Sequence, residues 1–134
     1  MNLHPIPAGG DRLGEHHGLG VSVLEFKMTT ADTGGGLFVV ENRFHAKGGP
    51  PRHLHHEQDE WFYVVEGEFA LEIGDQKLSL TPGDSVLAPR GVPHVWAFTG
   101  SGTRRMLVAF TPAGRMEEFF HEVTKADAMP PQDP

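Results

Sequence analysis

The most informative absence in this chain of 134 residues is cysteine, which does not occur at all. Disulfide bridges and thiolate metal ligands are therefore excluded. No stretch approaches the ~18 consecutive apolar residues that a membrane-spanning helix needs. The N-terminus also lacks a basic segment followed by an apolar run, so we expect no secretory signal. These absences predict a soluble, cytoplasmic protein.

Positive charge is scarce as well. Eleven lysines and arginines face 18 aspartates and glutamates, which gives a formal net charge of −7 with neutral histidines. A nucleic-acid-binding surface needs a basic patch, and an anionic membrane attracts basic segments. We therefore expect neither nucleic acid nor membrane as a partner. A chain of this length forms one domain and buries roughly two-thirds of its unfolded surface.

Glycine and proline are abundant, with 17 and 11 residues spread along the chain. They separate short apolar or alternating runs, a pattern that is typical of an all-β sandwich or barrel. Phe69, Leu71 and Ile73 alternate with less apolar residues, which predicts a strand with one buried face. Turns are expected at 74–75 and 81–84. The strands are expected at 21–28, 36–46, 60–65, 69–73, 78–80, 85–88, 94–99 and 104–111.

One short C-terminal helix completes the expected organisation. Met116, Phe119, Phe120 and Val123 follow the i, i+3, i+4, i+7 spacing of an amphipathic helix. The tail after it holds three prolines and two aspartates, which predicts a flexible segment. The predicted divisions are an N-terminal loop region at 1–19, a barrel at 20–113, the helix at 114–124 and the tail at 125–134.

Histidine is the commonest metal ligand among side chains, and four of the nine histidines lie between residues 45 and 56. In an extended segment His53 and His55 point to the same face, with α-carbons about 6.5–7 Å apart. His56 has the opposite parity and should point away. Glu60 opens the next strand and His94 opens a later one. These positions predict that His53, His55, Glu60 and His94 converge on one ion.

Each of these residues taken alone also fits a solvated surface position. Taken together, three neutral imidazoles and one carboxylate fill four positions of an octahedron. Two positions then stay open for water, dioxygen or substrate oxygens, unlike a closed structural zinc site. The prediction is one divalent transition metal, and the donors leave Fe, Mn, Ni, Co and Zn as alternatives.

Two spaced motifs carry a family resemblance. The first has glycine at 48 and 67 around His53, His55 and Glu60. The chain in this respect resembles the cupins, whose first motif reads G-x(4–5)-H-x-H-x(3–4)-E-x(6)-G. That resemblance implies a double-stranded β-helix, or jelly-roll, barrel with the metal inside.

The second cupin motif reads G-x(5)-P-x-G-x(2)-H-x(3)-N, and here it is matched by Gly83, Pro89, Gly91 and His94. Phe98 stands where the motif usually has asparagine. That position is not a metal ligand in the family, so the departure makes the pocket more apolar without threatening metal binding. The resemblance carries the ligand role to the same four residues, His53, His55, Glu60 and His94.

Within the cupins the chain looks most like short single-barrel bacterial members described as similar to quercetin 2,3-dioxygenase. Residues 50–67 and 111–114, followed by the phenylalanines of the helix, carry this likeness. It suggests a dioxygenase that acts on an aromatic or enolic small molecule, with Glu60 as metal ligand and general base in turn. A metal-dependent isomerase or epimerase and a non-catalytic small-molecule-binding cupin remain alternatives, because one fold hosts many chemistries.

Strand parity places Phe62 on the face of Glu60, and Trp96 and Phe98 on the face of His94. These three rings either line a pocket for an apolar ligand or simply fill the barrel. A homodimer is also expected, because barrel edge strands are usually covered. The strand at 21–28 is the expected point of pairing with a partner's sheet.

Overall fold

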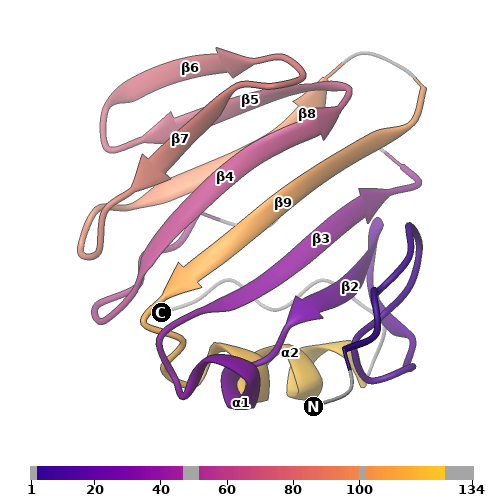
Figure 1. The fold of residues 1–134 in the computed structure, drawn as a ribbon. Helices are drawn as coiled ribbons and strands as arrows, with labels where there is room; N and C mark the ends of the chain where they lie inside the picture. Colours follow the sequence, from indigo (N-terminus) through magenta and orange to yellow (C-terminus); the bar gives the residue numbers. More distant parts are fainter. Residues whose placement is uncertain (1–2, 47–51, 100–101, 126–134) are drawn as a thin grey trace.

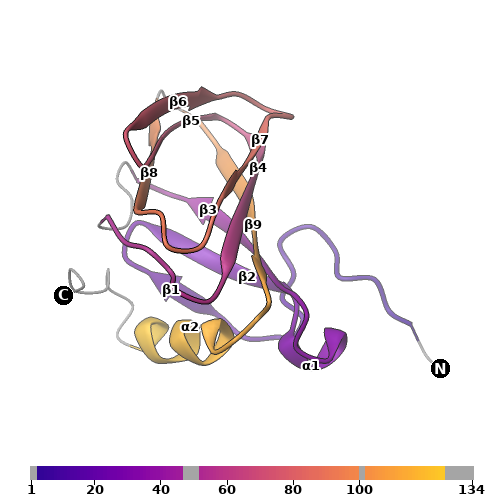
Figure 2. The same cartoon turned by 90° about the vertical axis from the view of Figure 1, so that its left-hand side faces the viewer.

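The computed structural model folds the chain into two antiparallel β-sheets, which face one another with the core between them (Figures 1 and 2). It describes residues 3–46, 52–99 and 102–125. One sheet has the strand order β1-β2-β3-β9-β4-β7, and the other has the order β6-β5-β8. The all-β jelly-roll prediction is confirmed. The strands are β1 (His17–Leu19), β2 (Ser22–Met28), β3 (Phe38–Phe44), β4 (Asp59–Glu66), β5 (Glu68–Ile73), β6 (Gln76–Leu80), β7 (Ser85–Ala88), β8 (His94–Thr99) and β9 (Arg104–Thr111).

Strand alternation decides which side chains enter the core. On β4, Glu60, Phe62 and Val64 are buried, whereas Trp61 on the opposite face is 36% exposed and stacks on Tyr63. Residues two apart on a strand share a face, so the alternation in the sequence maps directly onto this burial. The buried face of β4 therefore presents Glu60 to the space between the sheets.

Tight turns join the strands at the predicted places. Glycine at 74 takes a φ of +60° in the two-residue connection where Ile73 of β5 pairs with Gln76 of β6. In the 81–84 turn, the Asp84 amide donates to the Thr81 carbonyl at 2.9 Å. The Asp84 carboxylate in turn accepts the Thr81 amide at 2.8 Å. Both predicted turns are confirmed.

Gly67 carries the chain from the six-stranded sheet into the three-stranded one, between β4 and β5. Its φ is +84°, in the region that L side chains rarely adopt. A β-carbon there would lie 2.8 Å from Cγ of Arg104, so space as well as conformation requires glycine. Gly83 has a similar φ of +93° but no neighbouring atom within 4 Å of its β-carbon position.

The Gly67→Ala substitution should therefore destabilise the protein more than Gly83→Ala does. The backbone conformation alone costs each alanine about 1–2 kcal/mol. Crowding against Arg104 should add about 1–3 kcal/mol at position 67. Urea denaturation of the two variants measures the difference. Equal losses would show that Arg104 moves aside without cost.

The N-terminal segment covers β2, which corrects two expectations. The region predicted as loop at 1–19 ends in β1, which pairs with the first half of β2. The second half is covered by the preceding chain, where the Arg12 amide donates to the Phe26 carbonyl at 2.7 Å. Asp11 Oδ1 accepts the Phe26 amide at 2.7 Å. Since β2 is not an edge strand, the expectation that it pairs with a partner's sheet is wrong.

The helices differ in detail from the prediction. The expected C-terminal helix is α2 (Met116–Thr124), and Phe120 and Val123 pack against the core. Phe119, expected on the same apolar side, is 45% exposed. The connection between the strands expected at 21–28 and 36–46 contains a one-turn helix, α1 (Thr30–Thr33), which begins with a capping box formed by Thr29 and Asp32.

The tail beyond residue 125 lies outside the described residues. Among the residues that the structure describes, no helix is long and apolar enough to cross a membrane.

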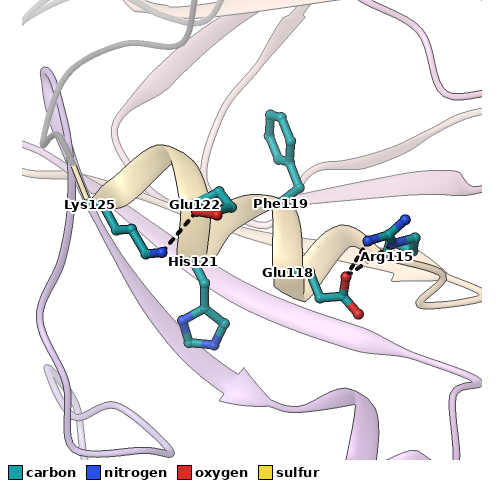
Figure 3. A pocket seen from close by; sticks show the side chains of 6 residues that line it. All are labelled: Arg115, Glu118, Phe119, His121, Glu122 and Lys125. Carbon is teal, nitrogen blue, oxygen red and sulfur yellow. Dashed lines mark hydrogen bonds and ion pairs between the residues drawn. The ribbon is translucent and has the colours of Figure 1, made fainter.

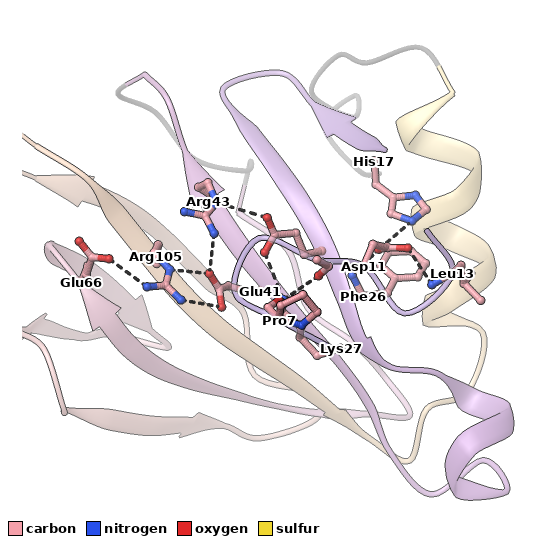
Figure 4. A network of polar contacts seen from close by, with 12 residues as sticks. Pro7, Asp11, Leu13, His17, Phe26, Lys27, Glu41, Arg43, Glu66 and Arg105 are labelled. Atoms are coloured by element: carbon pink, nitrogen blue, oxygen red, sulfur yellow. Dashed lines mark hydrogen bonds and ion pairs between the residues drawn. The ribbon is translucent and has the colours of Figure 1, made fainter. Parts of the chain in front are cut away.

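The outward face of the large sheet carries a network of ion pairs (Figure 4). Arg105 donates to both carboxylate oxygens of Glu41, at 2.6 and 3.2 Å, and to Glu66 at 3.0 Å. These carboxylates raise the pKa of Arg105 above its ordinary value. Glu25, also buried, pairs with Arg43 at 3.3 Å. The buried carboxylates of this face are thus neutralised by arginines that lie at the surface.

Candidate metal centre

The loop before β4 is fastened to the start of β8 by a short backbone pairing. The His53 amide donates to the His94 carbonyl at 3.0 Å, and the His94 amide donates to the His53 carbonyl at 2.7 Å. The Gly91 amide donates to the His55 carbonyl at 2.7 Å. The prediction assumed that His53 and His55 lie in a strand, but only His53 forms an isolated bridge. His56 is exposed, as its parity predicted.

Glu60 reaches the same place from the other sheet. It is the second residue of β4, and it pairs with Ala88 of β7 on one side and Phe110 of β9 on the other. Glu60 Oε1 lies 2.8 Å from His94 Nε2 and 3.0 Å from His55 Nε2. The distance to His53 Nε2 is 3.7 Å. The four residues therefore meet at one point between the two sheets.

The orientation of the His94 ring is compatible with the role of a metal ligand. His94 Nδ1 lies 3.3 Å from the Val92 carbonyl oxygen, which can only accept a hydrogen bond. With the proton on Nδ1, Nε2 presents a lone pair toward the Glu60 carboxylate, which is also an acceptor. That tautomer leaves Nε2 available to bind a metal ion, whereas the other tautomer, with the proton on Nε2, donates a hydrogen bond to Glu60. A carbonyl that orients a histidine in this way is a recurrent feature around metal ligands.

The charge state of Glu60 suits a metal ligand. Burial by itself would raise the pKa of Glu60, but hydrogen bonds with His53, His55 and His94 lower it far below the ordinary value for a glutamate. Glu60 is therefore an ionised carboxylate at neutral pH. Ionised carboxylates and neutral imidazoles are the forms that coordinate divalent ions.

The donor set fits one divalent ion. Each of the four residues offers one ligand atom, and these atoms all lie within 4.8 Å of one another. His94 and Glu60 are buried, whereas the side chains of His53 and His55 are 21% and 15% exposed. The cluster is thus closed on the barrel side and reachable from solvent on the side of His53 and His55. His53, His55, Glu60 and His94 could bind a metal whose identity the donors do not determine.

The three aromatic residues predicted for a pocket all lie inside the barrel, at different depths. Phe62 packs its ring against His94, with centroids 5.8 Å apart, and 6.4 Å from Trp96. Phe98 lies four residues beyond His94 on the same strand, about 13 Å along it. The Arg104 guanidinium covers its ring at 3.7 Å. Phe62 therefore borders the metal cluster directly, whereas Phe98 belongs to the far end of the core. Their role in binding a substrate remains a prediction.

One neighbour of the cluster was missed by the sequence reasoning. The Phe110 ring packs edge-on against His55, with centroids 5.5 Å apart. Met106, Val108 and Phe110 alternate along β9 and are buried, but from the sequence we expected only a strand at 104–111 and assigned it no inward face. The sequence did not reveal that β9 pairs with β4, and this pairing brings Phe110 next to the metal cluster.

A separate hollow of about 580 Å³ lies along α2 (Figure 3). It is lined by charged side chains and by Phe119 and His121. The ion pairs Arg115–Glu118 and Lys125–Glu122 hold these charged side chains, at 2.8 and 3.0 Å. None of its lining residues belongs to the metal cluster, so the hollow is not its entrance.

The fold and the cluster together define a class, the small double-sheet barrels with a His₃Glu cluster between the sheets. The family described as the cupin domain matches residues 41–110, which is just over half of the chain. The chain belongs to the cupin family. This confirms the resemblance that the two motifs carried.

The similar solved structures agree with the fold. An RmlC-like cupin from Shewanella frigidimarina has a TM-score of 0.69 at 23% identity, covering 88% of this chain and 96% of that one. KdgF from Halomonas sp. has a TM-score of 0.61 at 26% identity, covering 69% and 79%. Oxalate decarboxylase from Bacillus subtilis, a protein with Mn(II) centres, has a TM-score of 0.66 at 19% identity, covering 78% and 29%.

Curated relatives match over shorter segments. An oxidoreductase of Arthrobotrys oligospora is 38% identical over 53 residues, which are 38% of this chain and 21% of that protein. The transcriptional regulator PuuR of Escherichia coli is 36% identical over 59 residues, which are 44% of this chain and 32% of the regulator. The matches span between a fifth and a third of these relatives, so they establish a shared domain rather than a shared activity.

Proposed function

We propose that this cupin is a metal-dependent dioxygenase that acts on a small aromatic or enolic molecule. The observation that carries the proposal is the convergence of His53, His55, Glu60 and His94, buried on one side and open to solvent on the other. A fully closed site would serve structure alone, whereas an open one admits a reactant. The similarity to an oxidoreductase supports an oxidative reaction.

The metal ligands, Phe62 and Glu60 have different roles in the proposed reaction. The three histidines and Glu60 hold one divalent transition metal, which when bound supplies Lewis acidity at a substrate oxygen. Phe62, which borders His94, presents an apolar wall that suits a planar ring better than a sugar. Glu60 accepts the proton of the substrate hydroxyl, so that the substrate becomes electron-rich before it meets dioxygen. Both oxygen atoms of dioxygen enter the product, so the reaction needs no further reductant.

The experiment is oxygen consumption by protein reconstituted separately with Fe(II), Mn(II), Co(II) and Ni(II), offered a panel of flavonols and β-diketones. We expect uptake with at least one metal and none with the metal-free protein. Glu60→Gln removes a metal ligand and the base together, so it should reduce the turnover rate by at least about 10²-fold. The absence of oxygen uptake with every metal would contradict the proposal for these substrates.

A second candidate is a binding module that senses a small molecule without converting it. The observation that favours it is the similarity to PuuR, which is a transcriptional regulator. Calorimetry separates the two candidates, because a binding module would give a stable complex with the offered compound and no product. Conversion that continues under argon would instead indicate a metal-dependent isomerase or epimerase.

We also propose that the protein is a cytoplasmic homodimer. Trp61 of β4 pairs with Leu87 of β7, and these two side chains are 36% and 46% exposed on the outer face of the large sheet. Exposed apolar side chains gathered in this way are typical of interaction surfaces. Light scattering at micromolar concentration tests the proposal, and a Trp61→Glu variant should be monomeric. A monomeric mass for the unaltered protein would refute it.

A further inference from the structure

A second group of histidines and carboxylates lies where β1 meets α2, apart from the cupin motifs. Glu15, His17 and His121 each offer one ligand atom, and these atoms all lie within 4.8 Å of one another. Glu15 and His17 come from the start of the chain, whereas His121 comes from its last helix. All three lie outside residues 41–110, which match the cupin domain. No role for them follows from the family resemblance.

His17 is held in place by its neighbours. Its ring stacks on Phe26, with centroids 3.9 Å apart and planes 7° from parallel. The ring of His121 meets it edge-on at 5.5 Å. The residue is only 3% exposed. Figure 4 shows His17 beside α2 and Asp11, and Figure 3 shows His121 directed away from Phe119 on the opposite side of the helix.

The buried Nε2 atom of His17 has no hydrogen-bond partner among the residues that the structure describes. Asp11 Oδ1 and Glu15 Oε1 lie 3.2 and 3.8 Å from this atom as ion-pair partners, but neither accepts a hydrogen bond from it. A buried polar atom without a partner costs free energy, and an ion is one of its ordinary explanations. Nε2 of His17 is therefore directed into a cluster of carboxylate oxygens without being satisfied by them.

The electrostatic surroundings favour a cation. Besides Asp11 and Glu15, Glu117 contributes a carboxylate oxygen 3.7 Å from His121 Nε2. The nearby Arg12 does not neutralise these groups, because it makes a two-armed contact with Asp32 at 3.0 and 3.1 Å. Glu15 and His121 have side chains that are 54% and 37% exposed, so an ion can enter from solvent.

We propose that Glu15, His17 and His121 bind one zinc ion, which ties the N-terminal segment to α2. Two imidazoles and one carboxylate form a donor set that suits zinc, whose fourth position Asp11 or a water molecule completes. Residues from opposite ends of the chain supply the ligands, so binding stabilises the folded chain and not the unfolded one. This site is structural and independent of the cluster around Glu60.

Zinc stoichiometry after removal of bound metal by a chelator tests the proposal. We expect the unaltered protein to bind two zinc ions per chain, and Glu15→Gln and His121→Ala to bind one. Loss of one of these ligands should weaken zinc binding at the second site by at least about 100-fold. That is the upper limit for loss of a residue that only hydrogen-bonds to a metal ligand. The matched control is His16→Ala, because His16 is an exposed histidine beside His17 and outside the cluster. It should still bind two.

The same measurement in a His53→Ala/His94→Ala background removes the cupin site and isolates the second one. We expect one zinc ion, a zinc-dependent rise in melting temperature, and loss of both when His121→Ala is added. A different result would also support the site: the unaltered protein binds a single zinc ion, the double variant keeps that ion, and adding His121→Ala removes it. In that case the cupin metal centre, and not the second site, would lack zinc. The proposal is overturned if this background binds no zinc, or if Glu15→Gln and His121→Ala bind as tightly as the unaltered protein. If the background does not fold, the single variants decide alone.

Discussion

The His94→Ala substitution is expected to weaken divalent-metal binding at the cupin centre by at least about 100-fold. His94 is buried, its Nε2 lies 2.8 Å from Glu60, and the Val92 carbonyl holds its other ring nitrogen. No other described histidine side chain reaches Glu60 from β8, so nothing on that strand replaces the lost donor. Competition titration with a chromogenic chelator, using Mn(II) and Co(II), measures the affinity.

This measurement is best made in a His121→Ala background, so that the cluster at β1 and α2 does not contribute. His56→Ala is the matched control, because His56 adjoins the ligand His55 but is exposed and points away. The control should bind metal as the unaltered protein does. Undiminished binding by the His94→Ala variant would remove His94 from the ligand set and, with it, the basis of the proposed activity.

The Phe62→Ala substitution should cost about 3–5 kcal/mol of unfolding free energy, the range for removing a fully buried phenylalanine. Phe62 has no exposed surface, and its ring packs against those of His94 and Trp96. Neighbouring strands on both sides hold the backbone of β4, so the barrel cannot collapse easily into the space. Denaturant unfolding monitored by tryptophan fluorescence gives the value.

Phe119→Ala is the control with the same change of side chain, because Phe119 is 45% exposed on α2. It should cost about 1 kcal/mol or less. A loss below about 1 kcal/mol for Phe62→Ala would show that the ring adds little to the core. That result would favour the alternative in which Phe62 lines a substrate pocket.

Strand periodicity predicted the interior of the barrel well, because it depends only on local geometry. Glu60 and Phe62 on one strand, and His94 and Trp96 on another, are buried as their parity requires. The glycine and proline turns were predictable for the same reason, since each is decided by the φ that a few neighbouring residues must adopt. The two motifs predicted the four-residue cluster from sequence spacing alone.

The cover of β2 was not predictable in this way. β1 has only three residues, too few for a periodic signal, and Asp11 and Arg12 cover the rest of β2 from a segment outside the strands. The expected pairing of residues 21–28 with a second subunit overlooked this cover. The capping box of α1 was readable from Thr29 and Asp32, but a single turn is too short for a periodic signal.

The sequence by itself determined the fold class, the turns and the four residues at the cupin centre, because each follows from local conformation or from a spaced motif. Only the tertiary structure decided that Glu60 meets the histidines through a single oxygen, that Phe62 and Phe98 lie at different depths, and that Glu15, His17 and His121 form a second cluster. The physical reason is distance along the chain. Strand pairing and the docking of α2 on β1 bring together residues whose separation in sequence carries no periodic signal.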